Sequence, residues 1–269
     1  MKDYLQQLIS ERHAGLLARD VVREYLQARI LQSLQDSGAF LNWAFHGGTA
    51  LRFLYSIPRY SEDLDFALVD LKRSHRFRDH LAKMKTKFEA ENYTVGLKVN
   101  DRKTVVSGFV RFPGLLYELG ISPHPTEVIS VKVELDTKPP TGAVTATSLI
   151  RRYVTLNLLH HDKASLLAGK LCAIMTRGYT KGRDLYDLIW YLADRTWPSP
   201  NLALLNSALS QTCWAGPVIT ELNWWQFVAE RLKKMDWDRA LDDVRPFLER
   251  QGDLKLLTRE NVLQLLTSR

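Results

Sequence analysis

Residues 45–68, FHGGTALRFLYSIPRYSEDLDFAL, contain the pattern that decides the fold. The stretch includes a Gly-Gly-Thr step at Gly47, Gly48 and Thr49, and a helix is expected to begin at about Ala50. Glycine lets the backbone approach a ligand closely, and the free N–H groups at a helix start can hold phosphate. The sequence therefore predicts a phosphate-binding turn, with the Thr49 hydroxyl as a further polar group.

Two aspartates, Asp63 and Asp65, flank Leu64 at the start of a predicted buried strand over residues 64–69. Because successive side chains of a strand alternate between its faces, both carboxylates are expected on one side. Close carboxylates repel each other, and a divalent cation between them is the usual remedy. Hard oxygen ligands suit Mg²⁺, which keeps positions for phosphate oxygens. The pair is thus a candidate magnesium site, although most bare Asp-x-Asp pairs are solvated surface residues.

A third carboxylate is expected on a neighbouring strand, which is predicted over residues 128–135, and residues 130–136 (SVKVELD) supply it. In this run Val131, Val133 and Leu135 alternate with Lys132, Glu134 and Asp136. Glu134 stands in mid-strand, where a charge is costly unless it is used. Asp136, nearer the strand end, is the alternative third ligand, and a solvent-facing Glu134 on a half-buried strand fits the pattern equally well.

The rest of the chain predicts helices first, then a small sheet, then helices again. Residues 1–38 and 72–92 have helical spacing, residues 94–99 and 104–112 are strand-like, and residues 137–148 have the composition of a loop. After about residue 150 the strand signals stop, and amphipathic helices are expected at 163–175, 184–194, 202–212, 224–235 and 238–250. The predicted class is α/β (α+β). A mixed-sheet domain with N-terminal helices covers residues 1–145, and a C-terminal helical domain covers residues 146–269.

Composition excludes several classes of protein. With 45% hydrophobic and 25% charged residues the chain has the average make-up of a globular protein, and two cysteines in 269 residues exclude a disulfide-stapled domain. No stretch approaches the roughly 18 apolar residues of a membrane span, and no signal peptide is evident. We therefore expect a cytoplasmic protein without a membrane partner, in which Cys172 and Cys213 are reduced core residues. The net charge of +7 favours an anionic partner only weakly.

Together these motifs resemble the nucleotidyltransferase superfamily, which has a glycine turn, an acidic-x-acidic strand and a later carboxylate. The chain is more closely similar to the AbiEii/AbiGii toxin family. The matching residues of the first block are Gly47-Gly48-Thr49-Ala50-Leu51-Arg52, Arg59 and Ser61-Glu62-Asp63-Leu64-Asp65-Phe66. A second block follows in order, with Lys170, Arg177 and Lys181-Gly182-Arg183-Asp184-Leu185-Tyr186-Asp187. The resemblance spans roughly residues 40–195, and Gly169 stands where the family often has Glu.

The resemblance implies a nucleotidyltransferase that moves a nucleoside monophosphate from a nucleoside triphosphate (NTP) to a hydroxyl. It implies that Asp63, Asp65 and Glu134 hold Mg²⁺, and that Lys170, Asp184 and Asp187 are further catalytic residues. The expected nucleotide contacts are Gly47, Gly48, Thr49, Arg59, Ser61, Arg177, Lys181 and Arg183. Lys170 and Arg177 would offset charge on the leaving pyrophosphate. A salt-bridged helix pair, with Lys181 and Arg183 bound to the aspartates, is the structural alternative.

Characterised relatives in this family imply the acceptor and the partner. The resemblance implies a toxin of a toxin–antitoxin or phage-defence pair that modifies the 3′ end of tRNA, blocks aminoacylation and is controlled by an antitoxin, with Ser61 as a conceivable site of modification. Basic tracts at 69–87 (seven Lys/Arg, two Asp) and 151–187 (seven Lys/Arg, three Asp) would make a path for RNA phosphates. Ordinary solvated helix faces are the alternative for both tracts. A protein or small-molecule acceptor, or a non-catalytic nucleotide- or RNA-binding module, are the competing functions.

Overall fold

The structure is a computed structural model and describes residues 2–12, 16–179, 181–212 and 214–268. The chain forms two units. Unit 1 comprises residues 1–55, 60–138 and 147–160, and unit 2 comprises residues 56–59, 139–146 and 161–269.

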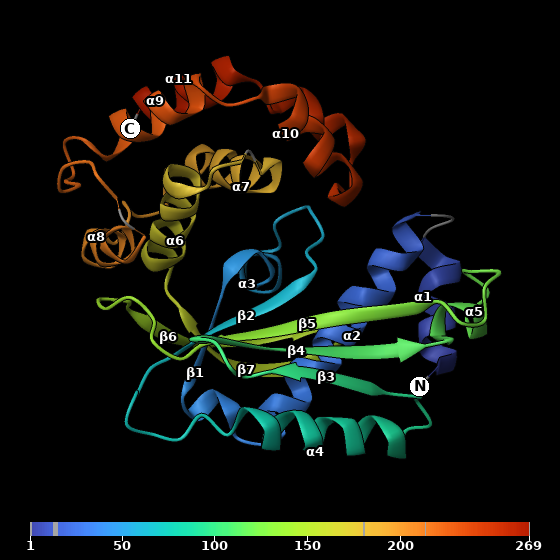
Figure 1. Ribbon diagram of the computed structural model, residues 1–269. Coiled ribbons are helices and arrows are strands. Elements are labelled where there is room, and N and C mark those ends of the chain that lie inside the picture. Colours follow the sequence, from blue (N-terminus) through green and yellow to red (C-terminus); the bar gives the residue numbers. More distant parts are fainter. Residues whose placement is uncertain (1, 13–15, 180, 213, 269) are drawn as a thin grey trace. The chain divides into compact units, whose positions relative to one another are not determined.

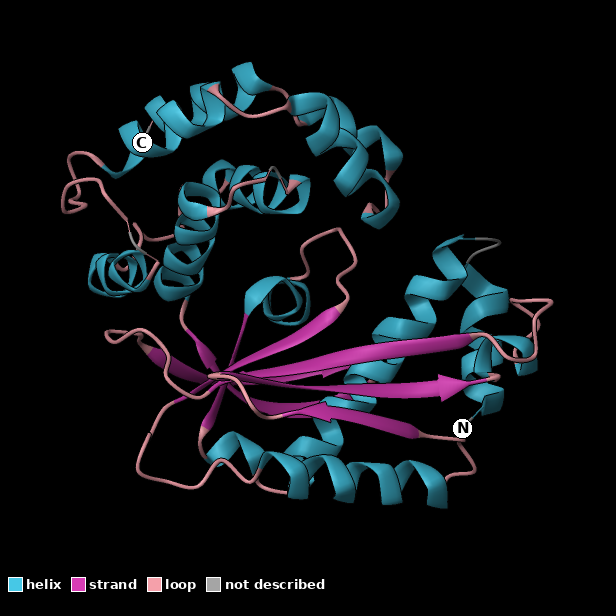
Figure 2. Ribbon diagram, in the orientation of Figure 1, coloured by secondary structure: helices cyan, strands magenta, loops and turns pink. Residues whose placement is uncertain are grey.

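Within the described residues, a seven-stranded mixed sheet has the order β3-β4-β5-β2-β1-β7-β6 (Figures 1 and 2). Its strands are β1 (Trp43–His46), β2 (Asp63–Leu68), β3 (Gly96–Asn100), β4 (Val105–Pro113), β5 (Val128–Asp136), β6 (Thr145–Arg152) and β7 (Val154–His161). β2 pairs in parallel with β5 and antiparallel with β1. This pairing places the predicted Asp63–Asp65 strand beside the strand of the predicted third carboxylate.

Helix α4 covers one face of this sheet. The helices of unit 1 are α1 (Lys2–Arg12), α2 (Leu16–Asp36), α3 (Gly47–Tyr55), α4 (Phe77–Ala90) and α5 (Leu115–Glu118), with a 3₁₀ turn η1 (Ala39–Leu41). The alternation in β5 buries Val131 and Val133 completely on the α4 side. Gly108 of β4 is opposite Val133, and a Cβ at this glycine would overlap Leu81 of α4. Glycine at this position therefore lets the helix lie close to the sheet (Figure 1).

Unit 2 is built from helices. These are α6 (Lys163–Thr176), α7 (Gly182–Ala193), α8 (Leu202–Gln211), α9 (Trp224–Lys233), α10 (Trp237–Val244) and α11 (Arg259–Thr267), with 3₁₀ turns η2 (Arg245–Phe247) and η3 (Gln251–Leu256). Asp162 caps α6 by accepting a hydrogen bond from the backbone N–H of Ser165, at 2.8 Å. The Ser165 hydroxyl accepts from the backbone N–H of Val144 at 3.0 Å, and Asn201 donates to the carbonyl of Gly142 at 2.7 Å. These bonds attach residues 139–146 to the helices.

The predicted α/β class is confirmed, but several boundaries differ from expectation. Helix α3 begins at Gly47 and not at about Ala50. The expectation that strands stop at about residue 150 is wrong, because β6 and β7 extend the sheet to His161. Unit 2 contains residues 56–59, 139–146 and 161–269, whereas the predicted helical domain covers residues 146–269. Cys172 is buried and free, whereas Cys213 lies outside the described residues.

Candidate active site

The three predicted metal carboxylates lie on one face of the sheet in unit 1. Glu134 of β5 is the register partner of Asp65 on β2, and Lys132 is the partner of Asp63. Asp136 is opposite Ala67, one position further along the same face. Gly108, which α4 covers, is opposite Val133, whose side chain alternates with Glu134. The carboxylates therefore lie on the face away from α4, and Glu134 rather than Asp136 is level with Asp65.

The glycine turn lies against the carboxylate strand. Gly47 has a φ of +79°, and a Cβ at this position would overlap the carboxylate of Asp65. Both facts require glycine, since other residues rarely adopt that backbone conformation. Thr49 is fully buried and its hydroxyl donates to the backbone carbonyl of Asp63. Thr49 therefore fastens α3 to β2 through its hydroxyl, while Gly47 and Gly48 form the first turn of the helix.

The carboxylate face is electrostatically strained without a cation. Burial raises the pKa of Asp63 to about 6, and the neighbouring charges of Asp65 and Glu134 add to this shift. The Lys132 ammonium lies 2.7 Å from the Glu134 carboxylate. Burial acts to lower the pKa of Lys132, but Glu134 and the two aspartates outweigh it and raise that pKa. Lys132 is thus a positive charge on which all three carboxylates act.

The residues on this face suit a magnesium ion chemically. Their side chains are hard oxygen donors, and the raised pKa of Asp63 shows that the cluster gains from a further positive charge. Among the described residues no three His, Cys, Asp or Glu side chains are already arranged as a metal cluster. Asp63 and Asp65, with Glu134 beside them, are the residues that would hold the ion, and its binding would require the side chains to adjust.

Two further predicted residues, Ser61 and Arg59, lie ahead of β2. The Gln27 side chain of α2 donates to the backbone carbonyls of Ser61 and Glu62, at 2.9 Å each, and so fixes the entry into β2. Arg59 belongs to unit 2, where its side chain is 2% exposed and makes a two-point ion pair with Asp187. A guanidinium held in this way is a structural partner of Asp187 rather than an open nucleotide contact.

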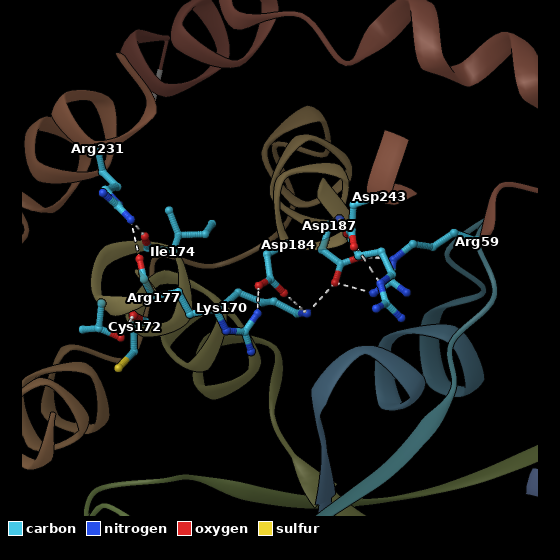
Figure 3. A network of polar contacts seen from close by, with 11 residues as sticks. Arg59, Lys170, Cys172, Ile174, Arg177, Asp184, Asp187, Arg231 and Asp243 are labelled. Atoms are coloured by element: carbon cyan, nitrogen blue, oxygen red, sulfur yellow. Dashed lines mark hydrogen bonds and ion pairs between the residues drawn. The ribbon is translucent and has the colours of Figure 1, made fainter. Parts of the chain in front are cut away.

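The second predicted block forms a continuous polar network in unit 2 (Figure 3). The Lys170 ammonium of α6 lies 2.9 Å from Asp184 Oδ1 and 2.6 Å from Asp187 Oδ2, both on α7. Arg177 donates to the other oxygen of Asp184, and Arg59 holds Asp187 from the opposite side. The two aspartates are three residues apart, so they share one face of α7. The structure thus brings five predicted residues together, in the order Arg59, Asp187, Lys170, Asp184, Arg177.

This network has more positive than negative charges. Burial would raise the pKa of Asp184, but Lys170 and Arg177 hold that pKa below its ordinary value. Lys181 has no ion-pair partner among the described residues, and its pKa is lowered by burial and by the neighbouring charge of Arg183. The two negative charges of Asp184 and Asp187 are thus outnumbered by four positive charges, those of Arg59, Lys170, Arg177 and Lys181. A cluster with surplus positive charge is a suitable binding site for the phosphates of a nucleotide.

Gly182 and Arg183 have packing roles beside the network. A Cβ at Gly182 would overlap the backbone carbonyl of Ala240, so glycine is needed where α7 begins against α10. Arg183 lies 3.7 Å from Asp243 and 4.0 Å from the centre of the Phe247 ring. Arg183 therefore packs against α10 and η2.

The basic tract at 69–87 does not lie beside the carboxylates. Most of it belongs to α4, on the opposite face of the sheet. Four of its seven cations pair with carboxylates: Arg76 with Asp79, Arg78 with Asp101, Lys85 with Glu89 and Lys87 with Asp36. This arrangement favours a solvated helix face over a path for RNA past the carboxylates.

Two residues on the carboxylate face were not predicted as part of the site. His46 is the register partner of Asp65 on β1, and Lys132 is that of Asp63 on β5. The alternation in residues 130–136 already placed Lys132 on the same side of its strand as Glu134. The parallel pairing of β2 with β5, which brings Lys132 to Asp63, has no local signature in the sequence.

Comparison with known proteins identifies the family. The model of the family described as nucleotidyl transferase AbiEii toxin, type IV toxin–antitoxin system, matches residues 29–263. The chain belongs to this family. It is therefore a nucleotidyltransferase toxin of a type IV toxin–antitoxin system, which confirms the predicted resemblance and the predicted enzyme class. Among curated proteins, none matches the chain by sequence.

Solved structures share the fold of this nucleotidyltransferase. MenT4, a nucleotidyltransferase toxin from Mycobacterium tuberculosis H37Rv, is 16% identical with a TM-score of 0.61, and the match covers 100% of this chain and 90% of MenT4. A putative nucleotidyltransferase from H. pylori is 19% identical with a TM-score of 0.55, over 92% of this chain and 93% of that one. JHP933 from Helicobacter pylori is 20% identical with a TM-score of 0.54, over 93% and 90%. No helix in the described part of the chain has the length and apolar character needed to cross a membrane.

Proposed function

We propose that this toxin transfers a nucleoside monophosphate from an NTP to the 3′ end of tRNA in a Mg²⁺-dependent reaction that blocks aminoacylation. The observation that carries the proposal is that Asp63, Asp65 and Glu134 lie together on one face of the sheet, beside the Gly47 turn. A protein that only binds nucleotide gains little from clustered carboxylates near phosphate. The expected context is the cytoplasm, where tRNA is charged, with a cognate antitoxin as regulator.

The reaction is a displacement at the α-phosphorus. The terminal ribose hydroxyl of the tRNA forms a bond to this phosphorus, and the bond to the bridging oxygen of the β-phosphate breaks, so that pyrophosphate leaves. Mg²⁺, when bound, would neutralise phosphate charge. Asp63 and Asp65 would hold the ion, and Glu134 would complete its ligand set or accept the proton of the attacking hydroxyl.

Residues of unit 2 contribute positive charge for the phosphates. Lys170 uses two of its three N–H donors on Asp184 and Asp187, so one remains for a ligand. Lys181 has no carboxylate partner within the described residues, and Arg177 is one-third exposed. We assign these three cations to the triphosphate. Asp184 and Asp187 position Lys170, since both are almost fully buried against it.

A labelling experiment tests the proposal. The full chain is incubated with each α-³²P-labelled NTP, Mg²⁺ and total tRNA, and the label is located by gel electrophoresis. We expect label on tRNA, none on tRNA whose 3′-terminal diol has been oxidised with periodate, and none with EDTA. Label on protein or on small molecules with unlabelled tRNA would overturn the tRNA acceptor.

Variants separate the metal site from general effects on the sheet. Asp65→Asn should abolish labelling while leaving the melting temperature within a few degrees of the parent protein. Asp136→Asn is the matched control, because this carboxylate lies on the same face but opposite Ala67. Full activity in Asp65→Asn would refute the metal assignment. Activity lost in Asp136→Asn and kept in Glu134→Gln would make Asp136 the third carboxylate.

A further inference from the structure

Lys132 lies beside the carboxylates of Asp63, Asp65 and Glu134, which are the groups that would bind a metal ion. From this geometry we infer that Lys132 is the resident counter-cation of the Asp63–Asp65–Glu134 set, exchanges with the divalent ion, and so sets the affinity of the toxin for metal. The inference rests on the magnesium site of the proposed function.

The position of Lys132 follows from strand register. In parallel pairing Lys132 is opposite Asp63, while Glu134, two residues on, is opposite Asp65. Neighbouring strands are about 4.8 Å apart, so the lysine stem rises from the sheet directly beside the aspartate. Its ammonium is 2.7 Å from Glu134 Oε1, and the Lys132 side chain is 29% exposed. The charge is thus partly shielded from water and close to all three carboxylates.

Glu134 cannot satisfy both cations equally. The Lys132 ammonium, 2.7 Å from Glu134 Oε1, occupies one of the roughly four lone-pair positions of this carboxylate, and two close positive charges repel each other. Binding of the ion at Oε1 therefore requires that Lys132 withdraw from this oxygen. The unmodified protein must therefore break the Lys132–Glu134 ion pair when it binds metal, and this weakens its affinity for the ion.

The Phe109 ring is already within reach of the Lys132 ammonium and is a partner that the ammonium can keep when it leaves Glu134. The Lys132 ammonium is 5.9 Å from the centre of the Phe109 ring on β4, and Phe109 is opposite Lys132 in the register. A ring face attracts a cation without competing for metal ligands. The four-carbon stem of lysine can turn from Glu134 toward the ring with rotations of its own bonds. The exchange requires no rearrangement of the backbone.

The affinity of the full chain for Mn²⁺, measured without nucleotide by the EPR signal of the free ion, tests the inference. Lys132→Met keeps the apolar stem and removes the charge, and Lys132→Arg keeps the charge. Lys98→Met is the matched control, because Lys98 is on the same face and in the same row, opposite Phe109. It lies three strand spacings, about 14 Å, from Asp63.

We expect Lys132→Met to bind Mn²⁺ roughly tenfold more tightly than the parent protein, and Lys132→Arg and Lys98→Met to stay within about threefold. In EDTA at pH 8 the melting temperature should fall by roughly 2–5 °C for Lys132→Met and not for Lys98→Met, because the carboxylates lose the positive charge that lies 2.7 Å from Glu134. Mn²⁺ affinity of Lys132→Met equal to that of Lys98→Met, or weaker than that of the parent, would overturn the exchange.

The outcomes separate this inference from the proposed function. Normal Mn²⁺ binding by the parent with no change in Lys132→Met refutes the role of Lys132 and leaves the metal site standing. Absence of Mn²⁺ binding in the folded parent and all variants refutes the metal site of the proposed function together with the exchange.

Discussion

The Arg59 guanidinium and the Asp187 carboxylate form two parallel hydrogen bonds, each 2.6 Å long, between residues 128 positions apart in the chain. Their side chains are 2% and 0% exposed. Two-point pairing of this kind is the geometry in which arginine and a carboxylate bind most strongly. The pair ties residues 56–59 to α7 and holds Asp187 in position for Lys170.

Removing one partner of this pair should destabilise unit 2 strongly. In Asp187→Asn, the buried charge of Arg59 loses its counter-charge, and Lys170 loses one of its two aspartates. We expect the free energy of unfolding to fall by about 3–5 kcal/mol, as measured by urea denaturation. Glu230→Gln is the control, since its pair with Lys233 is exposed, and it should not change stability measurably. Equal stability of the two variants would contradict the structural role of the pair.

Replacing either of two glycines of unit 2 by alanine should change the stability of the protein, in one case downward and in the other upward. Gly182→Ala forces a methyl group into the backbone of Ala240, so unit 2 should lose about 2–4 kcal/mol of stability or fail to fold. Gly169→Ala, within α6, has no atom within 4 Å of the new Cβ and should gain roughly 0.5–1 kcal/mol. Thermal melts of the two purified variants measure both effects. A stable Gly182→Ala protein would show that α10 does not abut the start of α7.

Because the carboxylate of Asp20 on α2 is buried, we expect the stability of the protein to depend on pH. Burial raises the pKa of Asp20 to about 6, with Arg23 opposing and Glu62 adding to the shift. The folded state therefore binds a proton that the unfolded state releases at about pH 3.9, and stability is lost as the pH rises through this window. Asp20→Asn removes the penalty. It should match the parent protein below pH 4 and exceed it by up to about 3 kcal/mol at pH 7.5.

The free energy of unfolding of the full chain, measured by urea denaturation at several pH values, checks this prediction. Asp79→Asn serves as the control, because Asp79 is 59% exposed on α4, and its difference from the parent protein should stay constant with pH. A stability gain in Asp20→Asn that is already complete at pH 4 would refute the proposed origin in burial of the carboxylate.

Substitution of Lys181 should weaken nucleotide binding without destabilising the fold. Because burial and, after it, the neighbouring cations lower the pKa of Lys181, neutralising this residue removes a cost of burying its charge and relieves repulsion in the folded protein. Lys181→Met should keep or raise the melting temperature but weaken NTP binding roughly tenfold, with a smaller dependence on salt. Lys234→Met, an exposed lysine of the same unit, should change neither. A fluorescent NTP analogue provides the measurement, and unchanged affinity would remove Lys181 from the phosphate site.

The sequence predicted the parts of the site that have a local pattern. The two-residue period placed Asp63 with Asp65 and Lys132 with Glu134, and the three-residue spacing placed Asp184 with Asp187 on one helix face. Strand register is set by contacts between distant segments, so the neighbourhood of Lys132 and Asp63 was not visible. The burial of Arg59 was hidden for the same reason, since its partner is 128 residues away.

The missed strands have a similar explanation. β1 has only four residues, Trp43–His46, and its apolar sequence continues from the segment before it, so no period is resolved. β7 (Val154–His161) alternates Leu156 and Leu158 with polar residues, but one of its two neighbours in the sheet, β1, is far away in the sequence. Helices α6 and α8 were predicted within one residue at each end, because their apolar spacing and the caps at Asp162 and Asn201 are local signals.

The separation between Arg59 and Asp187 also has a consequence during synthesis. Arg59 leaves the ribosome 128 residues before its carboxylate partner. At typical translation rates this interval lasts roughly 6–25 s, during which the guanidinium must remain hydrated. Helix α7 with Asp187 is made only in the last third of the chain, so nascent or truncated chains cannot complete the helical unit. The toxin therefore completes the ion-pair network around Asp187 only after 187 of its 269 residues have been made.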